Sequence, residues 1–218
     1  MSGSELRPLG LFGGTFDPIH HGHLRLAESA RESLGLARVR FIPAGQPPHR
    51  ASPGAQPTDR LAMARLATAD HPDFEVDPAE VEAACASYTI LSLERLRTER
   101  GPAQPLVLLL GVDAFLGLAS WKRWEEILDI THLAVANRPG YPLDPARMPA
   151  PLAQQFAARQ AGPKALAHAP GGRIVPFTMQ PLAISATEIR HLRHTGHSLR
   201  YLLPVPVIDY ISQHQLYL

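Results

Sequence analysis

The stretch LFGGTFDPIHHGHLRLAESARESLG, residues 11–35, changes character twice along its length. A short apolar run that starts at Leu9 stops at Gly13 and Gly14, where the chain can turn sharply because glycine carries no Cβ. Apolar residues then recur every three to four positions until Gly35, a typical helix stop. These residues are Leu24, Ala27, Ala30 and Leu34. The stretch therefore predicts a strand, a glycine turn and a helix over 22–34 in direct succession.

The same alternation continues along the chain. Apolar runs stand at 39–42, 74–76, 105–111, 132–140 and 173–179, and helical patterns stand at 58–70, 87–101, 124–130, 185–196 and 205–218. The run PLVLLLG at 105–111 is apolar on both faces, which is typical of a central parallel strand. We expect Thr58 to cap its helix and Pro176 to weaken its strand. The order predicts an α/β fold, a doubly wound parallel sheet with helices on both faces.

The chain length favours one domain. The 218 residues are enough to bury a sizeable core, and we expect a single domain over 1–218 with a small C-terminal helical part at 185–218. The segment 142–172 is rich in Ala, Pro and Gln and has poor periodicity. We interpret it as a surface excursion with some helix and not as a second domain.

Composition and charge exclude several classes of protein. Lys and Arg number 21 and Asp and Glu number 20, so the net charge of +1 gives no reason to expect a nucleic-acid surface. No apolar run approaches membrane-spanning length, and residues 1–10 lack the apolar core of a signal peptide. The single cysteine, Cys85, excludes an internal disulfide and fits a reducing compartment. We expect a cytoplasmic protein without nucleic-acid or membrane partners; monomer and homo-oligomer both stay open.

Four unusual segments follow predicted strands. They are GGTFDPIHHGH after the first strand, PAGQPPHR after the second, GVDAF after PLVLLL, and PLAISATEIR after RIVPFTM. In sheets of this kind, ligands bind beyond the carboxyl ends of the strands. The four segments are therefore expected to converge on one rim of the sheet and to form a site there.

The histidine-rich loop has the chemistry of a phosphate site. The first amides of a helix lack internal partners and carry partial positive charge. His20 and His23 are three residues apart, so they share a face in the first helical turn, where their N–H groups suit a phosphoryl group that gains charge. The loop lacks the spacing of a dinucleotide fingerprint and the G-K-[ST] of a Walker loop. A metal site and a purely structural role remain as alternatives, although no H-E-x-x-H or cysteine cluster supports a metal.

The segment GGTFDPIHHGHL resembles the signature of the nucleotidyltransferase superfamily, whose core [H/T]-x-G-H is His20-His21-Gly22-His23 here. The whole chain resembles the bacterial nicotinate-mononucleotide adenylyltransferases. The matching segments, in order, are PPHR, DRLAM, SYTI, LLLGVDAF, SWKRW, RPGY, ISATEIR and LLPVPVIDYI. The sequence departs from that family at Arg50, where Lys is usual, and at Leu91, where Asp is common.

The resemblance implies a Rossmann-like fold and the transfer of AMP from ATP to nicotinate mononucleotide, which gives deamido-NAD (nicotinate adenine dinucleotide) and pyrophosphate. ATP would arrive with Mg²⁺, for which no dedicated protein site is expected. His20, His23 and Arg190 are the expected catalytic residues. The expected ATP-binding residues are Gly13, Gly14, Thr15, Phe16, His20, His23, Gly111, Asp113, Ile184, Ser185 and Arg190.

Ser185 followed by Glu188 forms a capping box, which would place a helix start at the rim and Arg190 within reach of the β- and γ-phosphates. Without the resemblance, an ordinary capped helix with a solvated arginine is an equal reading. Asp113 would lie near the ribose, and its competing role is to cap the helix that follows it. Asp17 is the nearest carboxylate to the histidines, and the Asp-Pro step suggests a turn.

The mononucleotide needs an aromatic cover for its pyridine ring. The resemblance places Trp121 there, whereas Trp124 is expected in the core. The expected mononucleotide-binding residues are Thr15, His49, Arg50, Tyr88, Thr89 and Trp121, of which His49 and Arg50 lie on a proline-rich loop that could close over phosphates. Other acceptors, namely nicotinamide mononucleotide or phosphopantetheine, remain alternatives within the enzyme class. A non-catalytic nucleotide-binding module and a metal-dependent hydrolase are alternatives of other classes.

Overall fold

A computed structural model describes residues 6–47, 53–83, 86–137, 140, 143–180 and 182–218. Its sheet has the strand order β3-β2-β1-β4-β5-β6, the order of a Rossmann-like fold. The strands are β1 (Leu9–Gly14), β2 (Arg38–Pro43), β3 (Phe74–Val76), β4 (Leu106–Gly111), β5 (His132–Asn137) and β6 (Ile174–Thr178). The order reverses after β1, so the carboxyl end of β1 lies at the switch point where sheets of this kind bind ligands. The predicted α/β class and strand sequence are confirmed.

Helices separate the strands as the periodicity predicted. The α-helices are α1 (His21–Leu34), α2 (Pro57–Thr68), α3 (Ala79–Glu82), α4 (Thr89–Arg100), α5 (Val112–Leu116), α6 (Trp124–Ile130), α7 (Ala150–Arg159), α8 (Ala186–His194) and α9 (Val205–Gln213). Within the described residues, the short 3₁₀ helices are η1 (Leu118–Ser120), η2 (Pro145–Arg147) and η3 (Pro163–Ala167). No helix in the described ranges is both long and apolar enough to cross a membrane.

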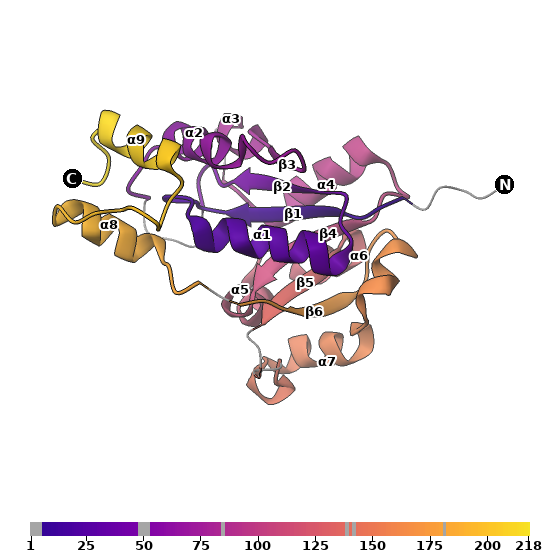
Figure 1. The fold of residues 1–218 in the computed structure, drawn as a ribbon. Helices are drawn as coiled ribbons and strands as arrows, with labels where there is room; N and C mark the ends of the chain where they lie inside the picture. Colours follow the sequence, from indigo (N-terminus) through magenta and orange to yellow (C-terminus); the bar gives the residue numbers. More distant parts are fainter. Residues whose placement is uncertain (1–5, 48–52, 84–85, 138–139, 141–142, 181) are drawn as a thin grey trace. The chain divides into compact units, whose positions relative to one another are not determined.

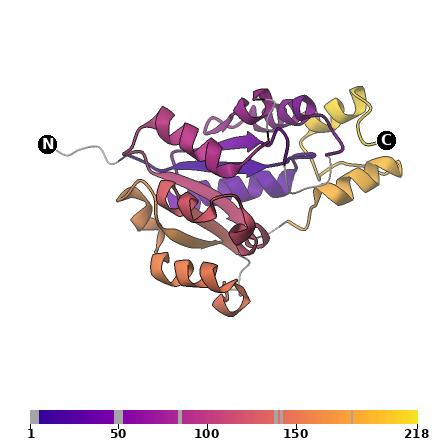
Figure 2. The same ribbon diagram turned by 180° about the vertical axis from the view of Figure 1, so that it is seen from behind.

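The chain divides into two compact units. The first unit comprises residues 1–12, 27–39 and 88–180. Its strands are paired in parallel, with Leu9 opposite Leu106, Leu108 opposite Leu133, and Leu133 opposite Ile174. In Figures 1 and 2, α4 and α6 lie on one face of these strands and the second half of α1 lies on the other. Side chains of β4 are buried from Leu106 to Leu110, because a central parallel strand is covered on both faces.

The strand β6 forms one edge of the sheet. Its pairing with β5 uses the carbonyl of Arg173, which accepts from the Leu133 amide, and the amide of Met179, which donates to the Asn137 carbonyl. Because alternate residues of a strand face opposite edges, Pro176 directs its nitrogen away from β5. The proline therefore costs the sheet no hydrogen bond, and the predicted weakening of this strand is absent.

The segment 142–172 adds short helices to the first unit. Leu152 and Phe156 of α7 are buried, and the ring of Phe156 lies 6.1 Å from that of Phe115 in an edge-on arrangement. The amide of Ala161 donates to the carbonyl of Ile174. Met148 and Leu166 are buried as well, so the segment contributes four side chains to a core that its weak periodicity did not predict.

The second unit comprises residues 13–26, 40–87 and 181–218. Helix α9 packs on α2, and the Tyr210 hydroxyl donates to Oδ1 of Asp59 at 2.9 Å. Helix α2 begins at Pro57 with Gln56 as its N-cap, so the predicted cap at Thr58 is wrong. The reason is that proline has the φ of a first helical residue and no N–H that needs an acceptor, so the helix starts at Pro57, two residues earlier than a cap at Thr58 implies.

Candidate functional site

The loop that follows β1 is built around the ring of Phe16. Phe16 is 2% exposed and has a φ of 50°, in the left-handed region that a bulky side chain rarely adopts. A Cβ on Gly14 would stand 2.8 Å from this ring, so only glycine lets the ring fold back under the chain. The glycine turn therefore serves to bury Phe16, which the sequence placed only among the nucleotide-binding residues.

His20 and His23 form a stacked pair at the start of α1. Their ring centroids lie 3.7 Å apart with 27° between the ring planes. The backbone N–H of His20 donates to Nδ1 of His23 at 3.2 Å, and the edge of Phe16 meets the His23 ring with centroids 5.1 Å apart. Because Nδ1 of His23 accepts a hydrogen bond, its proton resides on Nε2. The fold therefore presents His23 as an oriented Nε2–H donor.

His20 is neutral at physiological pH. The residue is 6% exposed, and burial, followed by the charge of His21, lowers the pKa of His20 to about 4. Its Nδ1 is buried, with no hydrogen-bond partner within the described part of the chain. A Cβ on Gly22 would stand 2.9 Å from this atom. Gly22 thus leaves room for the ring, and His20 can serve a ligand as a neutral donor or acceptor but not as a cation.

The helix start differs in one respect from the prediction. Helix α1 begins at His21 and not at Gly22, and the amide of His21 donates to the carbonyl of Leu202 at 3.0 Å. That amide is therefore occupied by protein, contrary to the expectation that the first amides await a phosphate. The contact comes from a residue far along the chain, which no local pattern indicates. The imidazoles are the stronger ligand groups at this turn.

The second predicted clamp, around α8, has its helix start where expected. Ser185 is the N-cap, and its Oγ accepts from the amide of Glu188 at 3.1 Å. Arg190 lies in the second turn, where Nη1 donates to the backbone carbonyl of Asp17 at 2.7 Å. The Arg190 side chain is 34% exposed and lines a hollow of about 480 Å³ with Gly54 and His194. Arg190 is thus bound closely at Nη1, and its partly exposed guanidinium can still meet an anion.

Asp17 takes a structural position in this unit. It is 6% exposed, and its carboxylate accepts from the amides of Gly54 and Ala55 and from the hydroxyl of Tyr217. These bonds support the turn role that the Asp-Pro step suggested. Among the residues with described positions, no cluster of three His, Cys, Asp or Glu side chains could hold a metal ion.

Arg60 is a residue that sequence reasoning missed. It is 0% exposed, and its guanidinium donates to the carbonyls of Thr15 (2.7 Å), Gly45 (2.8 Å) and Ala55 (3.4 Å). Burial lowers its pKa, and the nearby charge of Asp17 opposes that shift. Arg60 therefore ties together the loops that follow β1 and β2. An arginine in the first turn of a helix is typical of a solvated face, so the sequence held no signal for this role.

Five of the other predicted residues, Gly111, Asp113, Tyr88, Thr89 and Trp121, belong to the first unit. Gly111 is the N-cap of α5 and Asp113 lies in its first turn, so Asp113 is not the helix cap. Tyr88 is the N-cap of α4, and Lys122 Nζ lies 4.2 Å from the centroid of the Tyr88 ring. The structure thus brings the SYTI and SWKRW segments together.

Both tryptophans are half-buried, Trp121 after η1 and Trp124 at the start of α6, so the expectation that Trp124 lies in the core is wrong. Trp124 opens a short helix whose buried residues are Ile127 and Leu128, which leaves the indole at the margin of the core. The predicted residues His49 and Arg50 lie outside the described residues.

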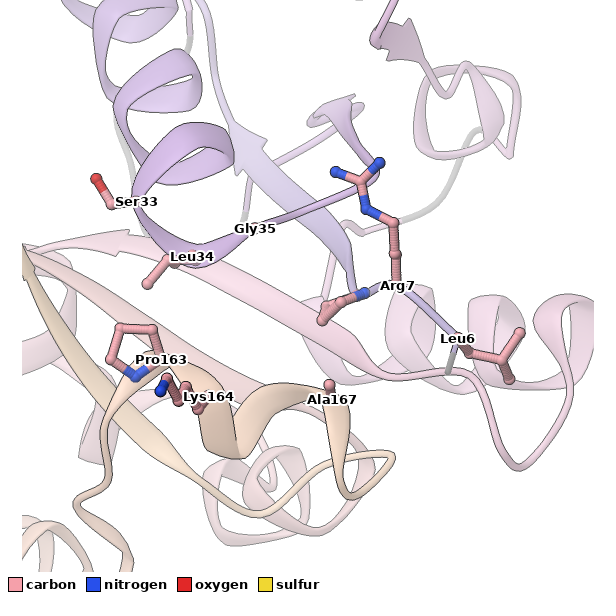
Figure 3. Close-up of a pocket in the computed structure, with 9 residues that line it drawn as sticks. Leu6, Arg7, Ser33, Leu34, Gly35, Pro163, Lys164 and Ala167 are labelled. Carbon is pink, nitrogen blue, oxygen red and sulfur yellow. The ribbon is translucent and has the colours of Figure 1, made fainter. Parts of the chain in front are cut away.

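A separate cavity of about 310 Å³ lies in the first unit (Figure 3). It is lined by Leu6, Arg7, Pro8, Ser33, Leu34, Gly35, Pro163, Lys164 and Ala167. None of the residues predicted for the site lines it, and the Arg7 guanidinium donates to the backbone carbonyl of Leu36 at 3.1 Å. This cavity is therefore not the candidate site.

Known proteins resemble this chain in fold and in sequence. The solved nicotinic acid mononucleotide adenylyltransferase of Plasmodium falciparum in complex with NaAD has a TM-score of 0.72 over 97% of each chain, at 15% identity, which supports the fold. The probable nicotinate-nucleotide adenylyltransferase of Dechloromonas aromatica is 56% identical over 96% of this chain and 97% of its own. The probable nicotinate-nucleotide adenylyltransferase of Acidithiobacillus ferrooxidans is 46% identical over 100% of this chain and 99% of its own. The cytidylyltransferase-like family model matches residues 11–192. The chain therefore belongs to the cytidylyltransferase-like family and, within it, to the nicotinate-nucleotide adenylyltransferases.

Proposed function

We propose that the chain transfers the adenylyl group of ATP to the phosphate of nicotinate mononucleotide, with nicotinate adenine dinucleotide and pyrophosphate as products. The observation that carries this proposal is the stacked pair His20 and His23 at the carboxyl end of β1, with the His23 proton fixed on Nε2. The names of relatives at 43–56% identity support the same substrates.

The reaction needs positioning and charge stabilisation. A phosphate oxygen of the mononucleotide attacks the α-phosphorus of ATP, a new P–O bond forms, and the bond to the β-phosphate breaks as pyrophosphate leaves. Negative charge spreads over the phosphoryl oxygens during this exchange. Fixed N–H donors in a partly dry site stabilise such charge without having to reorganise. We assign the α-phosphate to Nε2–H of His23 and a neighbouring phosphate oxygen to His20.

A cation is needed besides the neutral imidazoles. Arg190 supplies it, because a guanidinium keeps its charge in proteins. Its Nη1 is bound closely by the Asp17 carbonyl, and its Nη2 makes only a long bond of 3.4 Å to Thr187. We assign the guanidinium to the β- and γ-phosphates, next to the capped start of α8 at Ser185 and the preceding Ile184. The backbone of Gly13, Gly14, Thr15 and Phe16 completes the ATP contacts in this unit.

The first unit supplies the other proposed contacts. Gly111 and Asp113 are assigned to the ribose side of ATP. Tyr88, Thr89 and Trp121 are assigned to the mononucleotide, with Trp121 stacked on the pyridine ring. The contact between Lys122 and Tyr88 supports this grouping, because it brings the Trp121 segment next to the start of α4. Thr15, His49 and Arg50 remain proposed contacts of the mononucleotide on the basis of the family resemblance.

The proposal includes ATP bound as its Mg²⁺ complex, since Mg²⁺ usually keeps several waters and reaches such sites on the substrate phosphates. It also includes a cytoplasmic location, for which the single cysteine is the support. We retain one transferase domain over residues 1–218, with 185–218 as its C-terminal helical part.

Pyrophosphate release from Mg-ATP tests the proposal directly. Parallel reactions contain nicotinate mononucleotide, nicotinamide mononucleotide or no acceptor. Release that depends on the nicotinate form is expected. A strong preference for the nicotinamide form would move the specificity and keep the chemistry, whereas no release with either acceptor would leave a nucleotide-binding module as the better account.

Two variants then locate the chemistry. His23→Ala should lower kcat by about a hundredfold or more, the scale for the loss of one donor aimed at developing charge. His21→Ala is the matched control, since its imidazole lines a different hollow beside Arg200 and Val205. An unchanged kcat in His23→Ala would remove His23 from the mechanism.

A further inference from the structure

The carboxylate of Asp17 connects two distant segments of the second unit. Its Oδ2 accepts from the Gly54 amide at 2.7 Å. Its Oδ1 accepts from the Ala55 amide at 3.1 Å and from the Tyr217 hydroxyl at 2.7 Å. Hydrogen bonds from neutral donors to a buried carboxylate are strong, because the charge is poorly solvated otherwise. Asp17 is therefore fixed from two sides.

The same residue fixes the guanidinium of Arg190. Nη1 of Arg190 donates to the backbone carbonyl of Asp17 at 2.7 Å and lies 3.7 Å from Asp17 Oδ2. The only other hydrogen bond found for this side chain in the described ranges is a long one, 3.4 Å, to Thr187 Oγ1. The position of the guanidinium thus depends on where Asp17 is held.

Tyr217 reaches Asp17 through an unusual backbone. Its φ is 61°, and that of Gln215 is 52°, so the backbones of two non-glycine residues within three positions are in the left-handed region. Such conformations cost free energy and persist where surrounding contacts impose them. The ring of Tyr217 lies against Gly54, where a Cβ would stand 3.2 Å from it. Burial first, and then the charge of Asp17, raise the pKa of the Tyr217 hydroxyl, which stays a donor.

We propose that Tyr217 is a positioning residue, whose hydroxyl holds Asp17 so that Arg190 faces the phosphates of ATP. This inference rests on the proposed function, because Arg190 has its phosphate role there. Tyr217 itself touches no substrate in this account. It acts through one hydrogen bond and one carboxylate.

Tyr217→Phe removes only the hydroxyl and keeps the ring against Gly54. Tyr210→Phe is the matched control, because the Tyr210 hydroxyl, in the same unit, donates to Asp59 at 2.9 Å and not to Asp17. Calorimetry measures the Kd of Mg-ATP and of nicotinate mononucleotide for each protein. We expect Tyr217→Phe to raise the Kd of Mg-ATP about three- to tenfold, the scale of one typical hydrogen bond, because Tyr217 acts on ATP only indirectly, through Asp17. Its Kd for the mononucleotide, and both values for Tyr210→Phe, should stay within about twofold.

Hydrogen exchange provides a readout that needs no turnover. The amides of Gly54 and Ala55 donate to Asp17, so their exchange should accelerate in Tyr217→Phe and not in Tyr210→Phe. An unchanged Kd for Mg-ATP in Tyr217→Phe overturns the inference, and so does an equal rise for both substrates. If the wild type binds Mg-ATP but releases no pyrophosphate, the proposed function fails, while the Kd ratio still decides the role of Tyr217.

Discussion

Acidification should destabilise the fold through the buried imidazole of His20. In the unfolded chain His20 takes up a proton near its ordinary pKa of 6.5, but in the folded chain burial lowers that pKa to about 4. The unfolded state therefore binds more protons between these values. The contribution of neutral His20 to the free energy of unfolding is fully present above pH 6.5. It falls as the pH drops from 6.5 towards 4 and stays lost below pH 4.

The magnitude follows from the two pKa values. Between the two pKa values, the free energy of unfolding should fall by up to about 1.4 kcal/mol per pH unit. At about pH 5 it should be about 2 kcal/mol lower than at neutral pH. The residue is 6% exposed, so solvent screening hardly reduces this figure. The loss would be a large share of the stability of an ordinary domain.

Urea unfolding at about pH 7 and about pH 5 measures the effect. Between these two pH values, the free energy of unfolding of His20→Gln should fall by about 2 kcal/mol less than that of the wild type. Comparing the two proteins cancels other groups, including His132, whose pKa burial also lowers. His194→Gln is the control, because His194 is exposed and should leave the wild-type loss unchanged. Equal losses in the wild type and His20→Gln would refute the assignment of a neutral, buried His20.

Three further substitutions test other parts of the structure. Gly22→Ala should lower kcat about tenfold or more, because the new methyl displaces the His20 ring, whereas Gly162→Ala, which meets no atom within 4 Å, should not. Arg60→Met should lower the free energy of unfolding by about 3 kcal/mol or more in urea titrations, since it strips a donor from three carbonyls; a loss below about 1 kcal/mol would contradict the clamp. Trp121→Ala should raise KM for the mononucleotide and spare that for ATP in steady-state kinetics, and a rise confined to ATP would place the indole elsewhere.

Local chemistry explains the parts of the fold that the sequence could predict. The glycine turn and the helix after it depend on residues adjacent in the chain, and α1 departs from the predicted 22–34 by one residue. The cap of Ser185 on α8 also forms within four residues, as predicted. Such features need no knowledge of the tertiary structure.

Contacts between distant residues explain what could not be predicted. Tyr217 and Asp17 are 200 positions apart, and Arg60 reaches a carbonyl 45 positions away. No periodicity or motif links such residues. The positions of the two imidazoles followed from the motif, but their stacking, the His23 tautomer and the burial of His20 required the packing of Phe16 and Gly22 around them.

The edge position of Pro176 has a consequence for how copies of this chain meet one another. An open sheet edge can template the addition of a strand from a second molecule, the first step of many aggregates. Here the outward nitrogen at the middle of β6 carries no hydrogen, and the outward carbonyl of Ile174 already accepts from Ala161. A strand from another molecule would therefore lack a backbone N–H donor at Pro176, and the carbonyl of Ile174 would already be bonded. The proline therefore hinders the addition of a foreign strand at the β6 edge without removing a hydrogen bond between β5 and β6.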